Sequence, residues 1–308
     1  FIVGCGRSGT TVLRQFLSCS DDVFEIPFET AYFSDYYHRY GDISNSKNLR
    51  RLSVDLTLRF NYKRSKVDMN VFLKSLSNLS KLTYEDYFEL FANYSAKMNN
   101  KNNPPVIIEK TPRHAYYVKE IIDAFPKTKI IGIIRDPLAT ISSLMQTRAK
   151  RLNFLPISRR AKLLASVWDW TRYYQALRNL ERDLTPSHLT IVKYEDLILN
   201  TDKVVNTLNE FLGICIERNR FPKKLRKDSL YKYSSYLSQK QISLIISALP
   251  KEVFLNYKYE NLGKIEKHNE KIREIVYFLC RLEVWIETIL RPGHKRILKK
   301  ISNWGTRA

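Results

Sequence analysis

Short runs of apolar residues recur along the chain, separated by segments with helical periodicity. Residues 1–4 predict a strand, and Thr10 to Cys19 predicts the helix that follows it. Further strands are expected at Val106–Ile108, which lies between prolines, in "TKIIGIIRDP" and in "LTIVKYEDL". The run in "TKIIGIIRDP" is apolar on both faces, which is typical of a central strand in a parallel sheet. Strands that alternate with helices predict an α/β fold with a doubly wound parallel sheet flanked by helices.

Helices are expected at Ala115–Phe125, from Pro137 to about Lys150, over residues 158–183 and in "TDKVVNTLNEFLG". Asp136 suits the capping position in front of Pro137. Two longer segments complete the architecture. We predict a helical insertion over residues 36–103, where helical patterns occur without the turn clusters that bound strands, and a basic helical tail over residues 220–308.

The 308 residues contain no internal repeat and no low-complexity linker, so we expect a single domain over residues 1–308. No run of about 18 apolar residues occurs, which predicts that the chain has no transmembrane helix. The sequence starts at Phe1, so a signal peptide or anchor upstream would not be seen. The four cysteines lack metal-ligand spacing and the five histidines are scattered, so no metal site is expected.

The chain is strongly basic, with 52 Lys and Arg against 31 Asp and Glu, a net charge of +21. This balance implies anionic partners, such as phosphate cofactors, acidic glycans or a membrane surface contacted peripherally. The lysines scatter along the whole chain, which a solvated basic surface also explains. The stretch "RNRFPKKLRK" fits such a face, or contact with an anionic acceptor, better than specific binding of nucleic acid.

The first turn of the expected sheet carries phosphate-binding chemistry. In "FIVGCGRSGTT" a short strand runs through a glycine-rich, P-loop-like turn into a helix. Gly4 and Gly9 have the spacing of a nucleoside-triphosphate loop, but Thr10 stands where that loop needs a lysine. An anion here would be bound by backbone N–H groups and by the side chains of Arg7, Ser8, Thr10 and Thr11. A tight strand–helix turn without a ligand is the alternative for this stretch alone.

A second candidate stretch is "IIGIIRDPLATISSL". Arg135 ends a buried strand at the carboxyl edge, where open sheets bind ligands. Ser143 lies eight positions later, about two helical turns on. Both side chains can face the same crevice and hold one further phosphate. The alternative, for this stretch alone, is a local ion pair between Arg135 and Asp136.

Taken together, the two stretches resemble the sulfotransferase superfamily, whose donor is 3′-phosphoadenosine 5′-phosphosulfate (PAPS). The resemblance implies that Arg135 and Ser143 hold the 3′-phosphate of the donor. It places the 5′-phosphosulfate on Arg7, Ser8, Gly9, Thr10 and Thr11. The missing lysine fits, because no γ-phosphate or Mg²⁺ has to be held. Arginine at the cation position of the loop resembles the carbohydrate- and tyrosylprotein-type members.

Three further segments extend the resemblance, which covers about residues 1–35 and 105–212. In "FEIPFETAYF" it makes Glu29 the candidate catalytic base, and in "IIEKTP" it makes Lys110 the second catalytic cation beside Arg7. The segment "VKYEDL" places Tyr194 near the nucleotide. The segment "NLGKIEKH" is faintly similar to a loop that closes over the nucleotide, which makes Lys264 a candidate ligand.

The resemblance implies a sulfotransferase that moves the sulfuryl group of PAPS to a hydroxyl acceptor, expected to be a carbohydrate or glycolipid. A peptide tyrosine is disfavoured, because Ala31 stands where tyrosylprotein enzymes have an arginine. Glu29 would remove the hydroxyl proton, while Arg7 and Lys110 would stabilise the developing negative charge. Glu25 and His114 are the competing candidates for the base. A cytoplasmic location is expected, with the Golgi lumen as the alternative if an N-terminal anchor precedes Phe1.

Two other functions stay open on the sequence. A P-loop kinase would need the loop lysine and a carboxylate for Mg²⁺, and Thr10 replaces that lysine. A non-catalytic polyanion-binding protein could keep a degenerate nucleotide fold and use the basic surface instead. Binding of 3′,5′-adenosine bisphosphate, as opposed to ATP with Mg²⁺, distinguishes the sulfotransferase from both.

Overall fold

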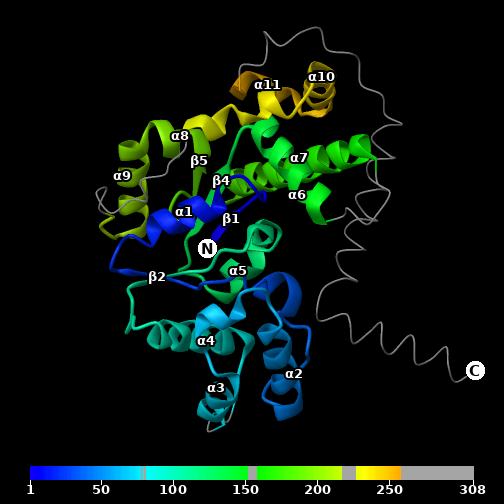
Figure 1. Cartoon of the computed structure of the whole chain (residues 1–308). Coiled ribbons are helices and arrows are strands. Elements are labelled where there is room, and N and C mark those ends of the chain that lie inside the picture. The colour runs from blue at the N-terminus through cyan, green and yellow to red at the C-terminus, as the bar shows by residue number, and fades with distance from the viewer. Residues whose placement is uncertain (78, 80, 152–157, 217–226, 258–308) are drawn as a thin grey trace, which may run out of the picture.

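The computed structural model describes residues 1–77, 79, 81–151, 158–216 and 227–257 (Figure 1). The strands are β1 (Ile2–Gly4), β2 (Val23–Glu25), β3 (Val106–Ile108), β4 (Ile130–Ile134) and β5 (Leu189–Lys193). The α-helices are α1 (Thr10–Leu17), α2 (Ser46–Thr57), α3 (Met69–Leu76), α4 (Tyr84–Met98), α5 (Val118–Ala124), α6 (Pro137–Arg151), α7 (Arg159–Asp183), α8 (Tyr194–Leu199), α9 (Thr201–Leu212), α10 (Gln239–Ala248) and α11 (Lys251–Tyr257). Shorter helical turns are η1 (Tyr32–Tyr36), η2 (Tyr62–Ser65), η3 (Pro112–Tyr116), η5 (Lys227–Leu230) and η6 (Lys232–Ser235).

All strand pairs in the described chain are parallel. One sheet has the order β1-β4-β5, and β2 pairs with β3 in a second one. The two sheets meet where Ile2 forms a bridge with Lys110 and its N–H donates to the carbonyl of Glu109 at 2.9 Å. The strands therefore follow one another as β2-β3-β1-β4-β5, with their carboxyl ends at a common edge. The expected α/β fold, with the strand in "TKIIGIIRDP" at the centre of its sheet, is confirmed.

Local signals explain where several helices begin and end. The Asp136 carboxylate accepts from the Ala139 N–H at 2.8 Å, and Pro137 is the first residue of α6, so the expected cap is confirmed. Helix α9 ends at Gly213, which adopts a left-handed conformation with φ 71°. The prediction of one helix over Ala115–Phe125 is wrong in its first part. The short turn η3 covers Pro112–Tyr116, and α5 starts only at Val118.

Strand β2 was not expected from the sequence. It has only three residues, and its sheet position comes from pairing with Val106–Ile108, about 80 residues further along the chain. After β2 the chain passes through Pro27 to Phe28 and Glu29, which are therefore held beside the end of β3. The N–H of Ile26 extends this pairing by donating to the carbonyl of Ile108 at 2.9 Å.

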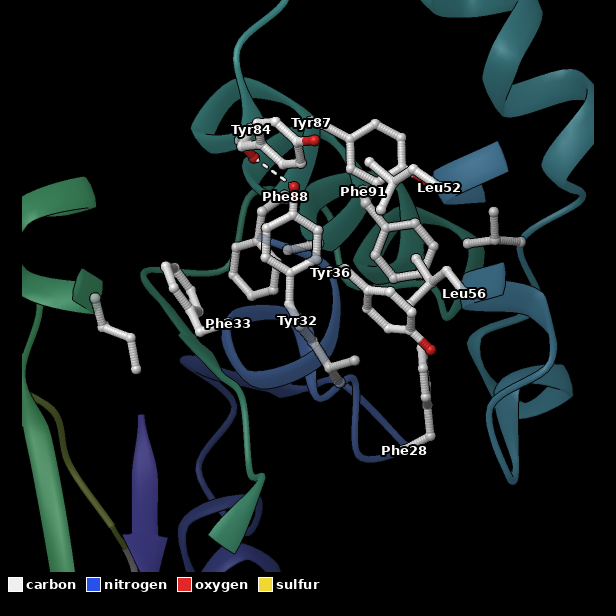
Figure 2. Packing of buried hydrophobic residues seen from close by; sticks show 14 of the residues in the cluster. Phe28, Tyr32, Phe33, Tyr36, Leu52, Leu56, Tyr84, Tyr87, Phe88 and Phe91 are labelled. Atoms are coloured by element: carbon white, nitrogen blue, oxygen red, sulfur yellow. Dashed lines mark hydrogen bonds between the residues drawn. The ribbon is translucent and has the colours of Figure 1, made fainter. Parts of the chain in front are cut away.

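The insertion over residues 36–103 contains α2, η2, α3 and α4, and its described residues contain no strand, as expected. An aromatic cluster joins it to the segment after β2 (Figure 2). Tyr32 packs on Phe88 with ring centroids 4.9 Å apart, and Phe28 packs edge-on against Tyr62 at 5.6 Å. The Tyr32 hydroxyl donates to the carbonyl of Tyr84 at 2.8 Å. Most rings of "YFSDYYHRY" thus belong to the core, and the segment that carries Glu29 rests on a rigid support.

The part of the tail that is described, residues 227–257, is helical as expected, with η5, η6, α10 and α11. In the described residues, no helix combines the length and apolar character that a membrane crossing requires. Lys264 and most of "RNRFPKKLRK" lie outside the described residues.

Candidate active site

The loop between β1 and α1 presents polar groups at the carboxyl edge of the sheet. Arg7 and Gly9 have positive φ angles of 71° and 99°, and Gly9 leads directly into α1. No side chain caps this helix at Gly9. Its first N–H groups, at the positive end of the helix dipole, are therefore suited to an anionic ligand. Ser8 and Thr10 are buried, whereas Arg7 and Thr11 are exposed.

The structure brings the two sequence stretches together. The Nε of Arg7 donates to the hydroxyl of Ser143 on α6 at 3.0 Å. Arg135, at the end of β4, donates from Nη1 to the carbonyl of Arg7 at 3.2 Å. Asp136, the alternative local partner of Arg135, caps α6 by accepting from the Ala139 N–H, and its charge also acts on Arg135. Two cations and one hydroxyl therefore meet at one end of the loop.

Arg135 is held in place on several sides. Its guanidinium lies 4.3 Å from the centroid of the Tyr194 ring, and its Nη2 donates to the carbonyl of Ser229 at 2.6 Å. Its own carbonyl accepts from the indole N–H of Trp170 at 3.0 Å. Burial lowers the pKa of Arg135, and the nearby Tyr194 and Glu195 oppose this effect. A half-buried guanidinium that is held by carbonyl oxygens and an aromatic ring is favourable for binding a phosphate.

Tyr194 closes the same side of the loop. It is the first residue of α8, and its hydroxyl is hydrogen-bonded to the hydroxyl of Ser229 at 3.0 Å. A Cβ atom at Gly9 would lie 2.3 Å from the Tyr194 ring, so only glycine permits this contact. Ser229 has no sequence signal, because it reaches this edge only when the chain after α9 returns to the sheet.

Among the described residues, the Nε of Arg135 is buried without a hydrogen-bond partner. The hydroxyl of Ser8 is also buried, with the thiol of Cys5 as a polar neighbour. A buried donor without a partner is costly unless a ligand satisfies it. The donor set of arginines, hydroxyls and helix N–H groups suits phosphate oxygens. Among the described residues, no group of three or more His, Cys, Asp or Glu side chains is arranged to hold a metal ion.

Glu29 and Lys110 form an ion pair next to this loop. Lys110 lies two residues beyond the end of β3 and forms an isolated bridge with Ile2 of β1, the strand that leads into the loop. Its side chain is only 6% exposed, whereas that of Glu29 is 47% exposed. The carbonyl of Glu29 accepts from the Nε of Arg59 at 3.2 Å. The pair thus combines a buried, fixed cation with a carboxylate that an outside molecule can reach.

The two competing bases have other partners. Glu25 lies 2.8 Å from the Nε of Arg14 and accepts from the Ser18 hydroxyl at 2.7 Å. His114 is completely buried, and its Nδ1 lies 2.9 Å from the carboxylate of Glu109. Neither is as accessible as Glu29.

The family model described as "Sulfotransferase family" matches residues 1–218. Among solved structures, the sulfotransferase domain from the curacin biosynthetic pathway is 18% identical, with a TM-score of 0.50, and covers 91% of this chain and 96% of that one. The sulfotransferase domain of the Synechococcus PCC 7002 olefin synthase is 16% identical, with a TM-score of 0.47, and covers 92% and 93%.

One curated protein is similar over a shorter region. The ATP synthase gamma chain of Lawsonia intracellularis (strain PHE/MN1-00) is 26% identical over 113 residues. This match spans 33% of the present chain and 39% of that protein, too little to indicate a shared family. The likeness to the curacin domain supports the fold, and the family model covers well over half of the chain. The expected family is thereby confirmed, and the chain belongs to the sulfotransferase family.

Proposed function

We propose that the protein transfers the sulfuryl group of PAPS to a hydroxyl group of a carbohydrate or glycolipid. The observation that carries this proposal is the cluster of Arg7, Ser143 and Arg135, with the Glu29–Lys110 pair beyond the ends of β2 and β3. Donors suited to a phosphate and an accessible carboxylate at one edge of the sheet support such a reaction.

The donor-binding residues divide between two ends of the nucleotide. Ser8, Gly9, Thr10 and Thr11 would hold the 5′-phosphosulfate through the first turn of α1 and their hydroxyls. Arg135 and Ser143 would hold the 3′-phosphate. The unpartnered Nε of Arg135 supports this role, since an incoming phosphate oxygen would satisfy it. Tyr194 and Gly9, which lie in close contact, would form the wall between the two ends.

When bound, PAPS supplies an activated sulfuryl group. Glu29 would orient the acceptor hydroxyl and take its proton on a carboxylate oxygen. Lys110 is fixed by burial and would stabilise negative charge that develops during transfer, together with Arg7. The Arg7–Ser143 hydrogen bond keeps this arginine over the loop.

The acceptor class rests on charge and on one substitution. The net charge of +21 favours an anionic acceptor. Ala31 provides no cation beside the Glu29–Thr30 pair to bind an acidic peptide. An acidic glycan or the head group of a glycolipid fits both observations. We also propose a cytoplasmic location, with which the free thiols of Cys5, Cys19 and Cys215 agree.

The test is transfer of labelled sulfate from PAPS to a panel of neutral glycans, acidic glycans, glycolipids and tyrosine peptides. We expect label on a glycan or glycolipid with the unaltered protein and a strongly reduced amount with Glu29→Gln. Label on peptides alone would contradict the proposed acceptor class. No label on any acceptor, with ATP-dependent phosphorylation instead, would contradict the activity.

A further inference from the structure

A buried carboxylate, that of Glu109, is hydrogen-bonded to the sequence neighbours of the two candidate catalytic residues rather than to their side chains. Glu109 directly precedes Lys110, and Thr30 directly follows Glu29. The Glu109 side chain is 2% exposed. One of its oxygens, Oε1, accepts from the N–H of Thr30 at 3.2 Å and from the Thr30 hydroxyl at 2.8 Å. The same oxygen accepts from the hydroxyl of Thr111 at 2.6 Å.

His114 faces the other oxygen of this carboxylate. Its Nδ1 lies 2.9 Å from Oε2 of Glu109, and its ring is completely buried. Phe33 packs edge-on against the imidazole at 5.7 Å, which fixes the ring. Burial alone would raise the pKa of Glu109, but His114 and the hydroxyls of Thr111 and Thr30 lower it to about 2. The group is therefore a carboxylate at neutral pH, with three hydrogen bonds to Oε1 and the His114 ring beside Oε2.

The hydrogen bonds cross between two segments that are about 80 residues apart in the sequence. Besides the contacts to Thr30, the hydroxyl of Thr111 accepts from the N–H of Ala31 at 3.1 Å. Ala31 has a left-handed φ of 51°, so the turn after Glu29 needs such support. The network thereby joins the backbone on one side of Glu29 to the backbone on one side of Lys110.

If Glu109 only paired with His114 to stabilise the core, it would not need hydrogen bonds to the neighbours of Glu29 and Lys110. Glu109 receives its donors from the residues adjacent to the two catalytic candidates, and a shift of the carboxylate would move both of them. Buried, charge-assisted hydrogen bonds have narrow geometry, so they fix the atoms that they join more tightly than apolar packing does.

We propose that Glu109 is a positioning residue that holds Glu29 in contact with Lys110 through its hydrogen bonds to Thr30 and Thr111. This inference rests on the proposed sulfuryl transfer. Because Glu109 is only 2% exposed, it would not contact the substrate itself. It acts by keeping the carboxylate of Glu29 within reach of the acceptor hydroxyl and beside the ammonium group.

The test compares Glu109→Gln with Glu25→Gln, a second paired carboxylate that contacts neither Thr30 nor Thr111. For Glu109→Gln we expect turnover per folded molecule to fall by about 10- to 100-fold, since a small misplacement of a catalytic group has an effect of that size. Affinity for 3′,5′-adenosine bisphosphate, measured by calorimetry, should stay unchanged. Glu25→Gln should leave turnover unchanged.

A double-mutant cycle separates positioning from general loosening of the fold. In a Glu29→Gln background, Glu109→Gln should cause no further loss of turnover, because the group that it positions is already gone. If the double variant loses turnover by the product of the two single losses, the proposal is overturned. If Glu109→Gln does not fold, Thr30→Val and Thr111→Val each remove one donor and keep the volume. Turnover equal to that of the unaltered protein in both would also overturn it.

One readout does not depend on activity. In a crystal structure of Glu109→Gln, or of Thr111→Val, we expect the contact between Lys110 and Glu29 to be lost. An unchanged contact would contradict the positioning role even if the protein transfers sulfate. Absence of sulfuryl transfer in the unaltered protein would instead contradict the proposed function, so the two failures are distinguishable.

Discussion

Arg135 and Ser143 are the residues proposed to hold the 3′-phosphate, and both also contact Arg7. Replacing both with alanine should raise the dissociation constant of 3′,5′-adenosine bisphosphate by about 100-fold, because charged hydrogen bonds contribute a few kcal/mol together. Affinity for 5′-AMP, which lacks the 3′-phosphate, should be nearly unchanged. Calorimetric titration of both nucleotides checks this, and equal losses would mean that the two residues do not recognise the 3′-phosphate.

Glu29 is the residue on which catalysis depends most in this account. Glu29→Gln keeps the shape of the side chain but removes the proton acceptor. We expect turnover to fall by about 10²- to 10⁴-fold, as is typical for loss of a general base. Donor affinity should hold, because the pair with Lys110 lies outside the phosphate-binding cluster. Single-turnover sulfate transfer measures the effect, and turnover within a few-fold of the unaltered protein would exclude the base role.

The sequence predicted some residues of the candidate site and missed others. Arg7, Arg135 and Ser143 stand in two recognisable motifs, and the fold brings these motifs into direct contact. Ser229 and Glu109 gave no signal, because their contacts depend on chain segments that are distant in sequence. Thr30 and Glu109, for example, are 79 positions apart. Lys264 stays a prediction, as it lies outside the described residues.

At the scale of elements, the junction of the first loop with α1 is the most sensitive to substitution. Gly9 combines a positive φ of 99° with the close approach of Tyr194, whereas Gly213 has a positive φ and nothing within 4 Å of the position that a Cβ atom would take. Gly213→Ala should cost about 1–2 kcal/mol of unfolding free energy, the penalty of the left-handed conformation alone. Gly9→Ala should cost more and should also weaken nucleotide binding, since Tyr194 must move.

Thermal unfolding with and without 3′,5′-adenosine bisphosphate measures both effects. Gly213→Ala serves as the matched control for backbone strain without a steric clash. If the two variants lose the same stability and bind the nucleotide equally well, the Gly9–Tyr194 contact does not shape the site.

The helices and strands themselves were predictable where the pattern is long and repeated. The apolar run of β4 and the capped start of α6 at Pro137 both follow from local sequence. Strand β2 did not, because three residues carry no period and the pairing with β3 decides their conformation. The break between η3 and α5 at Tyr117 was also not predicted, because the helical pattern of the sequence continues across it.

At the scale of the whole molecule, the buried Glu109 makes stability depend on pH. Its pKa in the folded protein is lowered to about 2 from 4.5, so folding favours the charged form. The resulting stabilisation is present above pH 4.5 and is lost as the pH falls toward 2. The shift corresponds to about 3 kcal/mol. Urea unfolding can be followed from about pH 6 down to about pH 2.5. Over this range, the free energy of unfolding should fall less for Glu109→Gln than for the unaltered protein. Parallel curves would contradict the low pKa.

Thermal unfolding in the presence of nucleotides shows which nucleotide the folded protein binds, and hence whether it uses PAPS. A ligand that binds only the native state raises the unfolding temperature, and the size of the rise reports its affinity. We predict a clear rise with 3′,5′-adenosine bisphosphate, a much smaller one with 5′-AMP and none with ATP and Mg²⁺, because Thr10 replaces the lysine that a triphosphate needs. Stabilisation by ATP and Mg²⁺ equal to or greater than that by 3′,5′-adenosine bisphosphate would contradict the account.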